Sequence, residues 1–195
     1  MPSELNLPSS LKSADPLFIS AVGMRRKNLY VVEVDVYNAG LYLSESALKA
    51  AKSLRLKDPE MNELPSVLAT HIATTGQNGA KAQVATKLVF VRDVGQSSVV
   101  EAFNDAFKGC NPSDVDNFKK TFGEAVGATG MKKGDSCTFI WLNGNGGLVV
   151  EKNGVITPVA KSPEIEKKLL QVYLQPSIAV SPELVSCLRE KLVLL

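Results

Sequence analysis

The segment at residues 135–159, DSCTFIWLNGNGGLVVEKNGVITPV, decides the fold class because three apolar runs are separated by two Asn-Gly turns. Asn and Gly accept the positive backbone φ of tight turns, so Asn-Gly between apolar runs predicts a hairpin. The three expected strands are residues 135–143, 147–152 and 155–159. Together they form an antiparallel meander. The glycines of the first turn lie between two strands, which excludes a phosphate-binding loop leading into a helix.

Three more strands are expected on the N-terminal side of this meander. The first two are residues 17–24 and 29–43, joined by a turn at the polar residues 25–28. Apolar and polar residues alternate in the middle of the second strand, as in an antiparallel strand with one packed face. A third strand is expected at residues 83–94, where Gly95 ends it.

Helices are predicted from capping residues and from good helix formers. The expected helices are residues 44–54, a short helix opened by Asp58-Pro59-Glu60, residues 97–108, residues 113–126, and two closing helices opened by Ser162-Pro163-Glu164 and Ser181-Pro182-Glu183. This order of elements predicts an α+β fold with helices packed against an antiparallel sheet. We expect a disordered lead over residues 1–16 and a single domain over residues 17–195.

Composition excludes several classes of protein. Of 195 residues, 45% are hydrophobic and 22% charged, with 22 basic against 20 acidic residues, which is too balanced for a nucleic-acid binder. No stretch is long and apolar enough to predict a membrane span. Three widely spaced cysteines and one histidine, His71, predict neither a metal site nor a disulfide framework. We expect a monomer in the cytoplasm, or in a plastid if a transit peptide has been removed.

Motifs for common chemistries are missing from the sequence: there is no Walker A run, HExxH, CxxC or G-x-S-x-G. Glu33 and Asp35 share one strand face, where such carboxylates more often serve solubility than acid–base catalysis. Arg25 and Tyr37 lie beside an apolar run at residues 39–43. A guanidinium and a phenol that converge on an apolar cleft would suit a carboxylate or phenolate ligand.

Several segments resemble the chalcone isomerase superfamily. They are Gly23-Met24-Arg25, the run VYNAGLYL at residues 36–43, KLVFVRDV at residues 87–94, and VSPE at residues 180–183. The resemblance implies an open-faced β-sandwich, in which a layer of helices covers a large antiparallel sheet and a ligand cleft lies between them. No cofactor is implied.

The resemblance also implies site residues. Arg25 matches the arginine of the catalytic members, Lys87 matches their lysine, and Asn104 matches their asparagine. The sequence departs from the enzymes elsewhere: Tyr37 replaces a threonine, no tyrosine lies at residues 96–97, and no serine or threonine lies at residues 166–167.

This pattern is similar to the non-catalytic, fatty-acid-binding branch of the superfamily. It implies that Arg25 and Tyr37 hold the head group of a fatty acid or similar amphiphilic carboxylate, with Lys87 and Asn104 as further ligand-binding residues. Two alternatives stay open. One is a chalcone–flavanone isomerase, an intramolecular lyase that stabilises an oxyanion with Arg25, Lys87 and Asn104 and takes a flavonoid-like ligand. The other is a non-catalytic helper of a biosynthetic enzyme.

Overall fold

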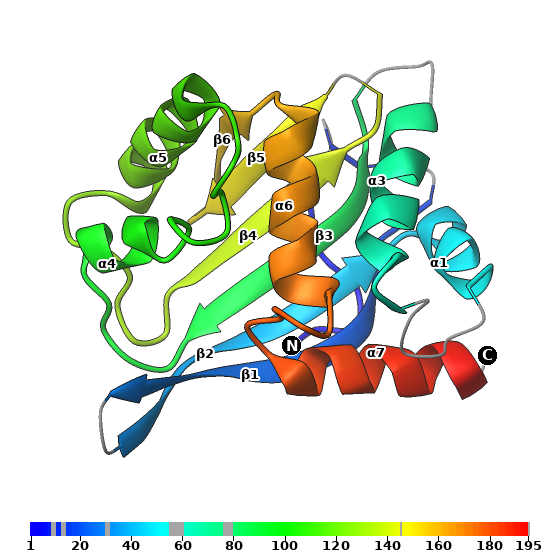
Figure 1. Cartoon of the computed structure of the whole chain (residues 1–195), viewed down its shortest axis with the longest axis horizontal. Helices are drawn as coiled ribbons and strands as arrows, with labels where there is room; N and C mark the ends of the chain where they lie inside the picture. Colours follow the sequence, from blue (N-terminus) through cyan, green and yellow to red (C-terminus); the bar gives the residue numbers. More distant parts are fainter. Residues whose placement is uncertain are drawn as a thin grey trace.

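The computed structural model describes residues 1–8, 11–12, 15–29, 32–54, 61–75, 80–144 and 146–194. Its strands are β1 (Phe18–Leu29), β2 (Val32–Leu43), β3 (Ala82–Phe90), β4 (Ser136–Leu142), β5 (Gly147–Lys152) and β6 (Val155–Ala160). They form one sheet in chain order, and every neighbouring pair is antiparallel (Figure 1). The predicted meander is therefore confirmed, and it extends through all six strands.

The described helices pack on one face of this sheet (Figure 1). They are α1 (Glu45–Lys52), α3 (Leu64–Thr74), α4 (Gln96–Glu101), α5 (Pro112–Val126), α6 (Pro163–Leu174) and α7 (Pro182–Leu194). The α+β prediction is confirmed, as is the N-cap of the first helix, where Ser44 accepts a hydrogen bond from the Ala47 amide. None of these helices is long and apolar enough to cross a membrane.

The main core lies between the helices and the sheet. At its centre, Phe103 packs edge-on against Phe118 and Phe122 with ring centroids 5.4 Å apart in each pair. Phe139 on β4 continues this aromatic cluster onto the sheet, 5.2 Å from Phe122. The sheet and the helical layer are therefore joined by large apolar side chains, whose burial is the dominant stabilising term in folding.

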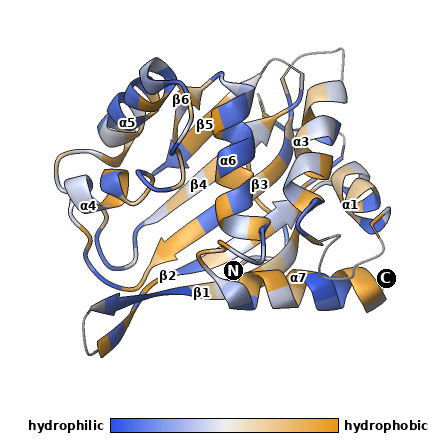
Figure 2. Ribbon diagram, in the orientation of Figure 1, coloured by the Kyte–Doolittle hydropathy of each residue, from blue (hydrophilic) through white to orange (hydrophobic). Residues whose placement is uncertain are grey.

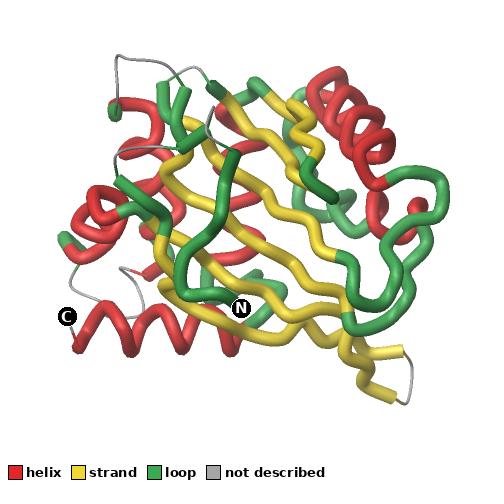
Figure 3. The backbone as a smooth tube through the Cα atoms, turned by 180° about the vertical axis from the view of Figure 1, so that it is seen from behind, coloured by secondary structure: helices red, strands yellow, loops and turns green. Residues whose placement is uncertain are grey.

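The opposite face of the sheet carries a second, smaller core. The N-terminal segment runs across this face (Figure 3) and buries Leu5 and Leu7 against the sheet beside Tyr42. Its backbone is fixed by a bridge between Glu4 and Phe18. The prediction of a disordered lead over residues 1–16 is therefore wrong for the residues described there, because alternate leucines in that segment find an apolar surface to cover.

The structure corrects the first hairpin and the helix that follows β3. β1 continues to Leu29, so residues 25–28 belong to the strand and are not the turn that the sequence predicted. β1 is hydrophilic where this hairpin projects from the sheet, which explains why its end resembled a turn in sequence (Figure 2). The helix expected at residues 97–108 is regular only as α4, which ends at Glu101. The helix expected after Asp58 lies outside the described residues.

Candidate functional site

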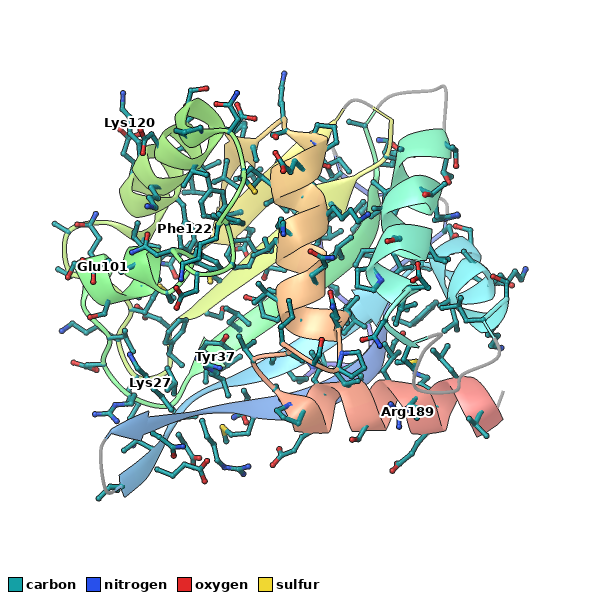
Figure 4. All side chains as sticks on the ribbon, viewed as in Figure 1. Lys27, Tyr37, Glu101, Lys120, Phe122 and Arg189 are labelled. Atoms are coloured by element: carbon teal, nitrogen blue, oxygen red, sulfur yellow. The ribbon has the colours of Figure 1, made fainter. Side chains whose placement is uncertain are left out.

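Arg25 and Tyr37 lie directly opposite each other on the neighbouring strands β1 and β2. Tyr37 is in turn opposite Phe90 of β3, and the two rings pack with centroids 5.4 Å apart. Phe90 and Tyr37 belong to the core between sheet and helices, so this row of residues faces the helical layer. Figure 4 shows Tyr37 close to the connection between α6 and α7.

The guanidinium of Arg25 reaches from the sheet to that connection. Its Nη1 donates a hydrogen bond to the Val180 carbonyl oxygen over 3.2 Å. The Val180 amide in turn donates to the carbonyl of Val172 in the last turn of α6, over 2.8 Å. A fixed positive charge, half-buried, thus stands at the boundary between the sheet and the helical layer.

The short distance between β1 and α7 depends on Gly23. A side chain at Gly23 would overlap the backbone of Leu184 and the Ser181 hydroxyl. A side chain of α7 also supplies a hydrogen-bond partner to the edge strand β1, since Glu183 accepts a hydrogen bond from the Met24 amide over 3.2 Å. The glycine two residues before Arg25 is therefore required by helix packing, because only the absence of Cβ permits this approach.

Tyr173, near the end of α6, completes the cluster. Its phenol lies against the Tyr37 phenol, and this contact contributes to a rise in the pKa of Tyr173. Burial raises the pKa of Tyr37 to about 12, and the nearby charge of Arg25 opposes this rise only in part. Burial also raises the pKa of Tyr173 well above its ordinary value. Both phenols are therefore neutral hydrogen-bond donors at physiological pH.

Cys137 of β4 lies within electrostatic reach of both phenols, and burial raises the pKa of its thiol to about 12. The thiol is thus also neutral at physiological pH. With its phenols and thiol neutral, the cluster has the chemistry to hold an anion: a permanent cation in Arg25 and neutral donors beside it. Sequence reasoning missed Tyr173 and Cys137, because both occupy ordinary core positions of an apolar helix and an apolar strand.

The structure does not bring Lys87 and Asn104 to this cluster. Lys87 pairs with Gly40 and Thr138, and it lies three residues from Phe90 on the same strand. An odd separation places side chains on opposite faces, so Lys87 belongs to the face that the N-terminal segment crosses. Asn104 follows α4 and is exposed, whereas its neighbour Phe103 enters the core.

Two further positions of the expected catalytic network have other tasks here. Gln96 is one of the two positions, 96 and 97, at which the resemblance implies the tyrosine of the isomerases; here it donates through Nε2 to the Gly123 carbonyl over 2.7 Å and so connects α4 to α5. Glu166 is one of the two positions, 166 and 167, at which the resemblance implies their serine or threonine; here it lies in the first turn of α6, and its backbone carbonyl accepts a hydrogen bond from the Trp141 indole over 3.1 Å.

An open six-stranded antiparallel sheet with helices packed on one face is the chalcone isomerase fold, and in this chain a half-buried arginine–tyrosine pair lies between the two layers. The family model described as chalcone isomerase-like matches residues 4–181, and the chain belongs to this family. The crystal structure of a fatty-acid binding protein from Arabidopsis thaliana is similar over 97% of this chain and 97% of that one, with a TM-score of 0.68 and 16% identity. At that identity the likeness establishes the fold. No curated protein matches the chain.

Proposed function

We propose that this protein is a non-catalytic binding protein for a fatty acid or a similar amphiphilic carboxylate, with the head group held by Arg25 and Tyr37. The observation that carries the proposal is the direct pairing of these two residues on the helix-facing side of the sheet. The shared fold with a solved protein described as fatty-acid binding supports it.

The donors of the cluster match a carboxylate. Arg25 donates one hydrogen bond, through Nη1, to the Val180 carbonyl. Because a guanidinium has five N–H donors in a planar fork, other donors remain for a second acceptor. The raised pKa of Tyr37 keeps its phenol protonated, so the phenol has a proton to donate. A carboxylate bound here would receive one charge-assisted hydrogen bond and one from a phenol.

The surroundings of the pair suit an acyl chain. Phe90 packs against Tyr37, and the aromatic cluster around Phe103 and Phe139 lies farther along the same face. Each buried methylene group adds about 0.8 kcal/mol to binding. Affinity should therefore rise with chain length until the available apolar space is full.

The test compares Arg25→Gln with Lys27→Gln, which removes an equal charge from an exposed position two residues further along β1. Calorimetry measures the affinities for straight-chain fatty acids and for the alcohols of equal length. A hydrogen bond to a charged group contributes about 1.5–3 kcal/mol, so Arg25→Gln should weaken acid binding about 10- to 100-fold and leave alcohol binding unchanged.

Lys27→Gln should bind the acids like the unmodified protein. Equal acid affinities in the Arg25 variant and the unmodified protein would refute the head-group role of Arg25. Alcohols that bind as tightly as acids would refute the preference for a carboxylate.

A further inference from the structure

A pocket of 390 Å³ lies at the other end of the helix-covered face, between α3, α6 and the β4–β5 hairpin. Its volume falls within the range of about 300–1,000 Å³ that is typical of small-molecule sites. The described lining residues are mainly apolar, with two charged side chains: Ala69, Ile72, Ala73, Trp141, Gly144, Gly147, Lys161, Pro163, Glu166 and Leu170. Neither Arg25 nor Tyr37 is among them, so this pocket is separate from the carboxylate site.

Glu166 is the unusual member of this lining. Its carboxyl group is half-buried beside Trp141 and Leu170, and no hydrogen bond or ion pair from the described residues reaches it. Burial alone raises its pKa from 4.5 to about 7. A carboxylate deprived of water and left without a partner is costly, because the charge loses hydration without compensation.

The second charged residue does not relieve this cost. Lys161 is exposed, so its ammonium group is solvated and needs no counter-ion from a ligand. His71 of α3, the only histidine, is not in the lining and lies beside Thr75. On the sheet side the pocket presents Trp141 and two glycines, which carry no side-chain charge. The group that would compensate the Glu166 carboxylate is therefore a cation bound next to it.

We propose that this pocket binds a small apolar molecule that carries a protonated amine, with the ammonium group paired to Glu166. The apolar part packs against Ile72, Leu170 and the Trp141 ring. An ammonium–carboxylate hydrogen bond in a partly desolvated pocket is stronger than the same pair in water, and it supplies the partner that Glu166 lacks.

Trp141 makes the site directly observable because it is the only tryptophan of the chain. The experiment titrates hexylamine into the protein and follows Trp141 fluorescence at pH 6 and pH 8. A saturable change is expected, with about tenfold tighter binding at pH 8, because a group with a pKa of about 7 is mostly ionised only at the higher pH. Hexanol and hexanoate should bind at least tenfold more weakly than hexylamine at pH 8.

Four variants locate the interaction. Glu166→Gln should weaken hexylamine binding at pH 8 at least tenfold and remove the pH dependence. Glu164→Gln, an exposed glutamate on the same helix, should change neither, and nor should His71→Gln. Arg25→Gln should also bind hexylamine normally, which separates this site from the carboxylate site.

Three results would overturn the proposal. Equal binding of hexylamine and hexanol would mean that the pocket takes apolar groups without regard to charge. Tighter binding of hexanoate, favoured at low pH, would mean that Lys161 governs the pocket. Unchanged hexylamine affinity in Glu166→Gln would remove the carboxylate from the interaction.

Discussion

The two ends of the helix-covered face differ in whether their partly buried polar groups have hydrogen-bond partners. At the Arg25 end, the guanidinium, two phenols and a backbone carbonyl are partners of one another. At the Glu166 end, a half-buried carboxyl group lies beside a pocket and has no hydrogen-bond or ion-pair partner among the described residues. α6 joins the ends, because it carries Glu166 in its first turn and Tyr173 in its last, about 10 Å apart along the axis.

The two ends would therefore favour ligand binding for different physical reasons. The Arg25 end is organised before binding, and a carboxylate there would add an acceptor to donors that are already oriented. At the Glu166 end, the ionised carboxylate is destabilised by partial loss of water, and a cationic ligand would compensate for this loss. Preorganised donors raise affinity because fewer groups have to be ordered on binding. An unpaired, partly buried carboxylate raises affinity for a cation because binding removes its desolvation cost. Four measurements test whether the difference is real.

The largest effect is expected for Gly23→Ala at the Arg25 end. The new methyl group would overlap the backbone of Leu184, so α7 has to move away from β1. Overpacking of this kind costs about 3 kcal/mol of unfolding free energy, which urea denaturation measures. Gly95→Ala is the matched control, because a methyl group there meets open space and should cost less than 1 kcal/mol. Similar losses in both variants would contradict the close contact.

Glu166→Gln should change how stability depends on pH. The folded protein holds the Glu166 proton up to about pH 7, whereas the unfolded chain releases it near 4.5. The unmodified protein therefore loses stability as pH rises from 4.5 through 7, by roughly 1.5 kcal/mol after a discount for partial exposure. The variant lacks this loss. Urea denaturation at pH 5 and pH 7.5 measures it, and parallel curves for both proteins would refute a buried Glu166.

Thr86→Val should raise the free energy of unfolding by about 1 kcal/mol. Thr86 lies on β3 between the two ends, fully buried, and its hydroxyl has no hydrogen-bond partner among the described residues. Valine has nearly the same shape and removes this unpaired group. Thr121→Val is the control, because Thr121 donates to the Asn117 carbonyl over 2.8 Å and should not gain stability. A loss of stability in Thr86→Val would reveal a partner that the structure does not show.

Tyr173→Phe should give the smallest effect, a reduction of about 0.5–1 kcal/mol in carboxylate affinity with little change in alcohol affinity. The variant removes the phenol that lies against the Tyr37 hydroxyl, although Tyr173 itself need not touch the ligand. Tyr42→Phe is the control, since the Tyr42 hydroxyl bonds the Pro2 carbonyl on the other face of the sheet. Calorimetry measures both, and equal effects would show that Tyr173 only packs.

Local patterns predicted most of the fold. Asn-Gly turns placed the meander, and Ser-Pro-Glu starts placed α6 and α7, because turn geometry and helix capping depend on a few neighbouring residues. Prediction failed where distant contacts decide. Residues 25–28 are polar but extend β1, since Arg26 pairs with Asp35 of β2 and with Glu183 of α7. The N-terminal leucines appeared unpartnered because the surface that they cover is formed by other strands.

For the candidate site, too, local patterns were predicted from the sequence and contacts between distant segments were not. Residue types and their spacing indicated Arg25 and Tyr37, and the register of β1 and β2 places the two opposite each other. The family resemblance grouped Lys87 with them, but the strand register places its side chain on the other face of the sheet, because a shift of one residue along a strand reverses the face. Tyr173 and the Glu166 pocket gave no sequence signal. Each belongs to an apolar helix pattern that is equally compatible with a plain core.

The sequence by itself determined the antiparallel α+β class, the family resemblance and the choice of Arg25 and Tyr37 as candidate site residues, since these depend on short-range patterns. Only the tertiary structure decided which face each residue occupies, which carboxyl group loses its water, and where Gly23 lets α7 approach β1. The physical reason is that burial and desolvation arise from segments far apart in the chain, such as Met24 on β1 and Glu183 on α7, which meet only after folding.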